Sequence, residues 1–274
     1  MGKSNNLSFL KDININKCFF DNSKYTVFYI HGVAGDCKSF KRISQKLEEN
    51  QISYFTLDLP CHGLSKDIPF SKINIRELAN IVVQVIQHYQ LRDIILFGHS
   101  MGGGIACLIY KKIKDLVKKV ILVDPINITL MSKFFNAFTL GFATLFKNEN
   151  LINKYQFFNV NKCSQEISNI DWIDFVKNPH DVLYKKKFIF FILTASFSNF
   201  PLLSKITKMY KEISCPLYLI MGKEDKMVDA QKTLKWAKKN NNKVQEIVIE
   251  NSGHVPFIEQ FSTFIEKFIN IIKK

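Results

Sequence analysis

The sequence predicts an α/β protein in which helices cover a mostly parallel sheet. Short apolar segments alternate with longer amphipathic segments along the chain, an order typical of βαβ units. The apolar segments are rich in Val, Ile, Phe and Tyr and almost continuous in hydrophobicity, as expected of strands buried on both faces. The chain has 274 residues, 47% hydrophobic and 23% charged, which argues against disorder, a coiled coil or a fibrous repeat.

Six segments are predicted to be the main strands of this sheet. In chain order they are Tyr25–Ile30, Tyr54–Leu59, Asp93–Phe97, Lys119–Val123, Pro216–Met221 and Val244–Ile249. Their β-branched and aromatic residues favour extended structure. Residues 7–20 are expected to add an antiparallel pair at one edge.

Two of the other segments show clear helical spacing. Apolar residues recur every three or four positions from Ile75 to Tyr89, and Asn74 with Glu77 forms a candidate N-terminal capping pair. A second apolar stripe runs through residues 261–272 at the end of the sequence. We expect both helices to pack their apolar faces on the sheet.

Residues 126–214 interrupt this alternation. They contain 13 of the 25 phenylalanines of the chain and lack a strand–helix rhythm. An insertion this long on an α/β core is typically functional, such as a lid or a substrate domain. We therefore predict a core formed by residues 1–125 and 215–274 and a cap formed by residues 126–214. About half of the cap rings are expected to pack the cap itself and the rest to line an apolar cavity.

The formal net charge is +14, but only three of the 38 basic residues are arginine: Arg42, Arg76 and Arg92. Nucleic-acid recognition favours the bidentate arginine fork, so we expect no nucleic-acid partner and attribute most of the charge to compositional drift. A weak association with an anionic membrane surface stays open.

Cysteine usage and targeting signals point to the same compartment. The six cysteines form no C-x-x-C pair, so we expect them to be reduced. The sequence has no metal-ligand cluster, phosphate-binding glycine loop or dinucleotide fingerprint, so we predict no metal and no cofactor. The first residues lead into no apolar signal segment, and no apolar run approaches the roughly 20 residues of a membrane span. The expected location is cytoplasmic.

A candidate nucleophile follows the third main strand. The segment Gly98-His99-Ser100-Met101-Gly102 is a G-x-S-x-G motif between that strand and a predicted helix from Met101 to Leu116. Such a turn exposes the serine oxygen above the carboxyl edge of the sheet, and its neighbours at positions 98 and 102 must be small. Ser100 is therefore the predicted nucleophile.

A serine hydroxyl needs a base, and His254 is the candidate because it lies in a loop just past the last strand. We expect His31 and His99 to make structural hydrogen bonds. The remaining histidines have no partner motif and are expected to be structural or on the surface: His62, His88 and His180.

The base in turn needs a carboxylate that fixes its tautomer. Asp225 stands at the carboxyl end of its strand, 29 residues before His254, and is the favoured acid. Asp124, at the end of the preceding strand, is the rival, and Glu224 and Asp229 remain open. The chain order Ser, Asp, His is that of an α/β-hydrolase triad.

The developing oxyanion needs donors that are already in place. The N–H of Met101, directly after the nucleophile, is one candidate. The other should come from the loop after the first main strand, His31-Gly32-Val33-Ala34-Gly35, where we nominate the N–H of Val33.

Together these motifs resemble the α/β-hydrolase superfamily, especially its esterase, lipase and proline-iminopeptidase-like members. The matching stretches are residues 31–40, 57–65, 98–103, 222–228 and 253–260. The resemblance implies an eight-stranded, mostly parallel sheet with helices on both faces and a helical cap inserted after strand six. The sequence departs from the family at Cys61, where glycine is usual. This difference affects the expected geometry of the local turn but not the expected triad.

The leading functional hypothesis is a serine hydrolase of carboxylic esters that acts through an acyl-enzyme on a small-molecule acyl ester. A proline-iminopeptidase-like aminopeptidase or a thioesterase is the alternative. The aminopeptidase would need cap carboxylates for the substrate's amino group, and the candidates are Glu149, Glu166, Asp171 and Asp174. Dehalogenases and epoxide hydrolases of this fold use Asp where this chain has Ser100. A non-catalytic binding protein is disfavoured because the whole triad is present.

Overall fold

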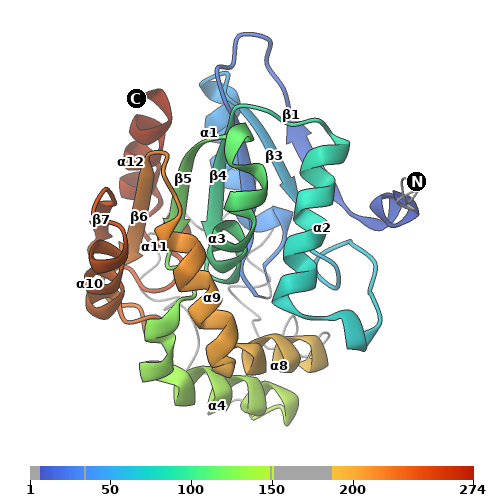
Figure 1. The fold of residues 1–274 in the computed structure, drawn as a ribbon, viewed down its shortest axis with the longest axis vertical. Helices are drawn as coiled ribbons and strands as arrows, with labels where there is room; N and C mark the ends of the chain where they lie inside the picture. The colour runs from blue at the N-terminus through green and yellow to red at the C-terminus, as the bar shows by residue number, and fades with distance from the viewer. Residues whose placement is uncertain (1–6, 34, 149, 151–186) are drawn as a thin grey trace.

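A sheet of seven strands organises the computed structural model, which describes residues 7–33, 35–148, 150 and 187–274 (Figure 1). Its order across the sheet is β1-β3-β2-β4-β5-β6-β7. β1 runs antiparallel to β3, and every other neighbouring pair is parallel. The strands are β1 (Ile15–Cys18), β2 (Thr26–Ile30), β3 (Ser53–Leu57), β4 (Ile94–His99), β5 (Val117–Val123), β6 (Leu217–Gly222) and β7 (Gln245–Ile249).

Helices connect the parallel strands, as expected of βαβ units. The α-helices are α1 (Lys41–Glu49), α2 (Ile75–His88), α3 (Met101–Ile113), α4 (Phe134–Leu145), α8 (Lys187–Ala195), α9 (Phe200–Lys211), α10 (Ala230–Asn240), α11 (Pro256–Glu259) and α12 (Phe261–Lys273). The short 3₁₀ helices are η1 (Leu7–Asp12), η2 (Cys37–Phe40), η3 (Phe70–Lys72), η4 (Lys114–Leu116), η5 (Ile128–Lys133) and η8 (Ser196–Ser198). The predicted cap of α2 is present, since the Asn74 side chain accepts the N–H of Glu77 at 2.9 Å.

The central strands are buried on both faces, as their continuous hydrophobicity predicts. In β2, Phe28 and Ile30 join one buried cluster, which also includes residues of α2, α3, α9 and α10. Val27 and Tyr29 alternate with them and join a second cluster with α1, α11 and α12. The six predicted main strands and the placement of helices on both faces are thus confirmed.

The prediction of eight strands is wrong for the part of the chain that the structure describes, where the sheet has seven strands. Residues 7–20 supply one edge strand, β1, and not the expected pair. Residues 7–12 instead form the 3₁₀ helix η1, which buries Leu10 against the larger cluster. A strand would alternate its side chains across the sheet, whereas this turn directs Leu10 inward.

The described parts of the insertion between β5 and β6 are helical. In Figure 1, α4, α8 and α9 lie at the end of the molecule toward which the arrows of β3 and β4 point. Helix α9 packs on α3 and shares its buried cluster through Leu203 and Ile206. The division into core and cap stays a prediction.

The rings predicted to line a cavity are only partly described. Phe197 is buried, whereas Phe142, Phe146 and Phe200 are exposed. Phe157 and Phe158 lie outside the described residues, as do the side chains of several others: Phe134, Phe135, Phe138, Phe188 and Phe190. Among the described helices, none is long and apolar enough to cross a membrane.

Candidate active site

Ser100 occupies the sharp turn between β4 and α3. Its backbone has φ 51° and ψ −116°, a conformation that costs an L-residue roughly 1–3 kcal/mol. The turn is tight because Gly98 and Gly102 touch: a Cβ on Gly98 would lie 2.5 Å from the carbonyl oxygen of Gly102. A Cβ on Gly102 would in turn collide with the carbonyl of Ile30 on β2. Both positions therefore need glycine, as the motif predicts.

His254 lies between Ser100 and Asp225. Its Nε2 is 2.8 Å from Ser100 Oγ, and its Nδ1 is 2.7 Å from Asp225 Oδ2. A neutral imidazole has one donor and one acceptor, so Nδ1–H donates a hydrogen bond to the Asp225 carboxylate and Nε2 accepts a hydrogen bond from the Ser100 hydroxyl. All three residues are buried. The structure thus brings the three predicted residues into one hydrogen-bonded line.

The Asp225 carboxylate is held from both sides. While Oδ2 faces His254, Oδ1 accepts the backbone N–H groups of Met227 at 2.7 Å and Val228 at 3.0 Å. The loop that carries Asp225 also meets the loop that carries His254, because a Cβ on Gly222 would collide with the carbonyl of Gly253. This close approach sets the two loops at hydrogen-bonding distance.

The other acids considered from the sequence do not take this place. Asp124 is fully buried, and its Oδ1 accepts the N–H of Gly222 at 3.0 Å. Burial and the neighbouring Asp225 raise the pKa of Asp124 well above its usual range. The side chain of Asp229 caps α10 by accepting the N–H of Lys232, and Glu224 is exposed.

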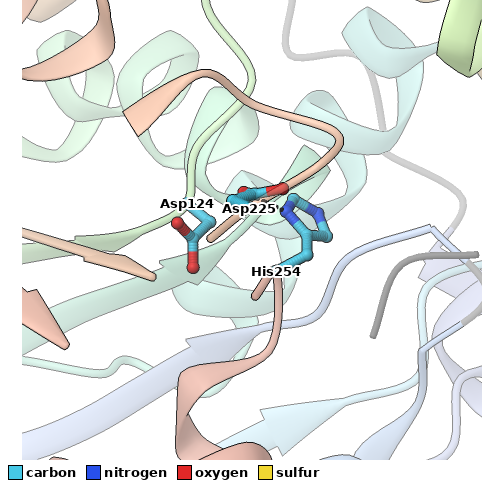
Figure 2. A group of neighbouring side chains, drawn as sticks. All are labelled: Asp124, Asp225 and His254. Atoms are coloured by element: carbon cyan, nitrogen blue, oxygen red, sulfur yellow. Dashed lines mark hydrogen bonds and ion pairs between the residues drawn. The ribbon is translucent and has the colours of Figure 1, made fainter. Parts of the chain in front are cut away.

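Asp124, Asp225 and His254 also form a group of atoms of the kind that bind metals (Figure 2). One carboxylate oxygen of each aspartate and one nitrogen of His254 lie within 4.8 Å of one another. The hydrogen bond between Asp225 and His254 already uses two of these groups. The expectation of no metal stays a prediction.

Sequence reasoning assigned no role to Glu259. This side chain is fully buried and accepts the N–H of Gly253 at 2.8 Å and the N–H of Val255 at 3.0 Å. It therefore holds the backbone on both sides of His254. Its spacing, five residues after the histidine and inside an apolar helical turn, is the signal that could have indicated it.

The structural roles expected for His31 and His99 are confirmed. His99 Nε2 lies 2.8 Å from the carbonyl oxygen of His254, so this nitrogen carries the proton and donates. His31 Nε2 accepts the N–H of Leu59 at 2.9 Å, so its Nδ1–H donates to the carbonyl of Gly32 at 2.7 Å. Burial lowers the pKa of both histidines, which keeps them neutral.

The predicted oxyanion donors come from two different elements. Met101 is the first residue of α3, where a helix leaves N–H groups without an intrahelical partner. Val33 is half-buried in the turn after β2. That turn passes beside Ser100, since a Cβ on Gly32 would lie 3.1 Å from Ser100 Cβ. Asp58 anchors the loop downstream by accepting the N–H of Cys37 at 2.6 Å.

Cys61 shows why the related family usually has glycine at this position. Its φ is 67°, in the left-handed region, although its side chain is buried. Only glycine reaches this region without cost. The turn at Cys61 therefore keeps a left-handed backbone conformation that favours glycine, although the residue is cysteine.

The match to a family model for the alpha/beta hydrolase fold spans residues 25–261, so this chain belongs to the α/β-hydrolase family. The family predicted from the motifs is thereby confirmed.

Relatives and solved structures agree with this assignment. The chain is 25% identical over 255 residues to "Putative esterase/lipase 2" of Mycoplasma genitalium, covering 92% of this chain and 91% of that protein. It is 30% identical over 232 residues to "Putative esterase/lipase" of Haemophilus influenzae, covering 83% and 76%. An esterase from Exiguobacterium antarcticum has the same fold, with a TM-score of 0.78, 19% identity and 96% of each chain covered.

Proposed function

We propose that this protein is a serine hydrolase that cleaves carboxylic esters, with Ser100 as nucleophile, His254 as general base and Asp225 as the acid that orients it. The observation that carries the proposal is the unbroken line of hydrogen bonds from Asp225 through His254 to Ser100, at 2.7 and 2.8 Å. The esterase/lipase names of the relatives indicate the same class of substrate.

In the proposed reaction, Ser100 Oγ attacks the ester carbonyl carbon while its proton passes to His254 Nε2. The Asp225 carboxylate stabilises the imidazolium that forms. The N–H groups of Met101 and Val33 donate to the oxyanion of the tetrahedral intermediate. His254 then protonates the alcohol as it departs, and the acyl group stays bonded to Ser100 Oγ. Water, deprotonated by His254, then attacks the acyl carbonyl carbon. His254 returns the proton to Ser100 Oγ as the bond to the acyl group breaks, and the carboxylic acid leaves.

The helical insertion of residues 126–214 is proposed to cap the site and to bind the acyl chain. Each buried methylene gains about 0.8 kcal/mol, so kcat/KM should rise with chain length until the cavity is full. We expect esters of roughly C4–C8 acids to be better substrates than acetates. A monotonic fall from acetate through butyrate, hexanoate and octanoate would show that the phenylalanines only pack the cap.

The test combines p-nitrophenyl esters with a fluorophosphonate probe that labels activated serines. Ser100→Ala should abolish both hydrolysis and labelling without loss of folding. Ser44→Ala is the matched control, because Ser44 is also buried but donates to Lys41 within α1. Labelling of the Ser100→Ala protein would show that another residue is the nucleophile.

The same assay separates the alternative substrates. Pro-p-nitroanilide hydrolysis faster than ester hydrolysis would indicate an aminopeptidase, and a preference for acyl thioesters would indicate a thioesterase. The carboxylates that an aminopeptidase would require, Glu149, Glu166, Asp171 and Asp174, lie outside the described residues.

A further inference from the structure

Asp124 has a role that the proposed triad does not explain. It directly follows β5 with φ 41°, a left-handed conformation that is costly for a residue other than glycine. The backbone N–H of Asp124 donates to Ile220 on β6 at 3.0 Å, and its side chain is fully buried. The fold therefore fixes a carboxyl group in the interior, behind the catalytic loops.

The two oxygens of this carboxyl group have different surroundings. Oδ1 accepts the N–H of Gly222, as described above. Oδ2 is buried and has no hydrogen-bond partner among the residues that the structure describes. An ionised carboxylate can only accept hydrogen bonds, so this buried oxygen would be left unsatisfied, which is unfavourable. The same oxygen is satisfied if it carries a proton and an acceptor lies beside it.

Asp225 is that acceptor. One oxygen of the Asp124 carboxyl group and one of the Asp225 carboxyl group lie within 4.8 Å of each other, and Figure 2 shows Asp225 between Asp124 and the imidazole of His254 in this view. Two carboxyl groups this close in a buried site do not both ionise. Asp225 already accepts three N–H groups, from His254, Met227 and Val228, whereas Asp124 accepts one, from Gly222. The proton therefore belongs on Asp124.

We propose that Asp124 is a positioning residue: a neutral carboxylic acid whose Oδ2–H donates a hydrogen bond to the Asp225 carboxylate. This rests on the proposed function of Asp225 as the acid of the triad. The hydrogen bond holds the carboxylate from the side opposite His254, so that Asp225 keeps its orientation when the imidazole becomes charged. The electrostatic surroundings also favour a protonated Asp124, because burial, Asp225 and Glu259 together raise its pKa.

Infrared difference spectroscopy tests the protonation state without reference to activity. The spectrum of the wild type minus that of Asp124→Asn at pH 7 should contain the carbonyl stretch of a neutral carboxylic acid. A difference spectrum with only the carboxylate stretch would overturn the proposal. Because the band does not depend on turnover, it would survive even if Ser100→Ala proved that another residue is the nucleophile.

Kinetics of two substitutions test the positioning role. An asparagine amide can still donate to Asp225 and accept from Gly222, so Asp124→Asn should keep kcat within about threefold of the wild type. Asp124→Ala loses the donor and should lower kcat about ten- to hundredfold with little change in KM. A loss in Asp124→Asn as large as that in Asp124→Ala would contradict the proposal.

Asp93 provides the matched control. It is an aspartate with a similar left-handed backbone, φ 49°, but it pairs with Lys118 on the surface. Asp93→Ala should therefore report the backbone cost of alanine in this conformation and leave kcat unchanged. If Asp124→Ala fails to fold, Asp124→Gly removes the same carboxyl group and accepts the positive φ without strain.

Discussion

Two loops approach Ser100, and they are held in different ways. The loop that carries His254 is fixed beside the imidazole ring itself: Glu259 accepts the N–H groups of Gly253 and Val255, and His99 donates to the carbonyl oxygen of His254. The loop that carries Val33 is held through its backbone: His31 donates to the carbonyl of Gly32, which belongs to the same peptide group as the Val33 N–H, and Asp58 accepts the N–H of Cys37 four residues later.

This difference follows from what each loop supplies. In the proposed reaction the loop of His254 supplies a side chain that receives and returns a proton, and such a transfer requires hydrogen-bonding distance at both ring nitrogens. The loop of Val33 supplies a backbone N–H in the proposed reaction, and the position of that N–H depends on the course of the chain over several residues. We therefore expect substitutions around His254 to affect turnover and substitutions around Asp58 to affect stability first.

The largest effect should come from Asp225→Asn. Asparagine keeps the shape but presents the wrong group to His254 Nδ1, and in a serine triad this change lowers kcat on the order of 10⁴-fold. Asp229→Asn is the control, because asparagine also caps a helix well and Asp229 caps α10. A greater loss of kcat in Asp124→Asn than in Asp225→Asn would assign the acid to the end of β5 instead.

Glu259→Gln should rank second. The amide offers one acceptor oxygen where the carboxylate offers two, so either Gly253 or Val255 loses its partner. We expect kcat to fall about tenfold or more, with a smaller change in KM. Glu266→Gln, on the part of α12 that faces solvent, is the control. Unchanged kcat in Glu259→Gln would show that the ring of His254 is held without this backbone support.

Asp58→Asn tests the other loop. Asp58 accepts the N–H of Cys37 at one oxygen and, at the other, the N–H of Leu64 and the amide of Asn14, both at 2.8 Å. One oxygen cannot serve all three donors, so the free energy of unfolding should fall by about 1–3 kcal/mol. Denaturant titration measures this change. A loss of kcat larger than that of Glu259→Gln, without loss of stability, would reverse the comparison between the two loops.

The smallest effect concerns pH and His99. Burial, followed by the neighbouring His254, lowers the pKa of His99 well below 6.5, so below that pH the unfolded chain binds a proton that the folded protein does not. Stability of the wild type therefore decreases on acidification, at most about 1.4 kcal/mol per pH unit from this group. His99→Gln lacks this loss, so the difference in unfolding free energy between wild type and variant should shrink from pH 7 to pH 5. A constant difference would contradict a neutral His99.

The sequence was sufficient for the main strands and for the residues around Ser100. Strands such as β2 and β4 are buried on both faces, so their continuous hydrophobicity is a local signal. Ser100, Asp225 and His254 each stand just past a strand, and parallel strands bring their carboxyl ends to one edge.

The roles of Asp124, Glu259 and Asp58 could not be predicted in the same way. A single carboxyl group has the same appearance in the sequence whether it is solvated or buried. Its state depends on contacts between segments far apart in the chain, such as that of Asp124 with Gly222. The 3₁₀ helix at residues 7–12 has a similar origin, since Leu10 packs on a core formed by later segments.

The pairing of β5 with β6 has a consequence for the history of the protein. Val120 lies opposite Leu217 and Val123 opposite Ile220, so the chain leaves and re-enters the sheet at adjacent strands. The intervening segment can lengthen, shorten or be replaced by recombination without a change in the register of the sheet. Under the proposed function, in which residues 126–214 bind the acyl chain, substrate range can therefore diverge between paralogues while the chemical step is inherited intact. A chimera that exchanges residues 126–214 between two relatives would recreate such an event.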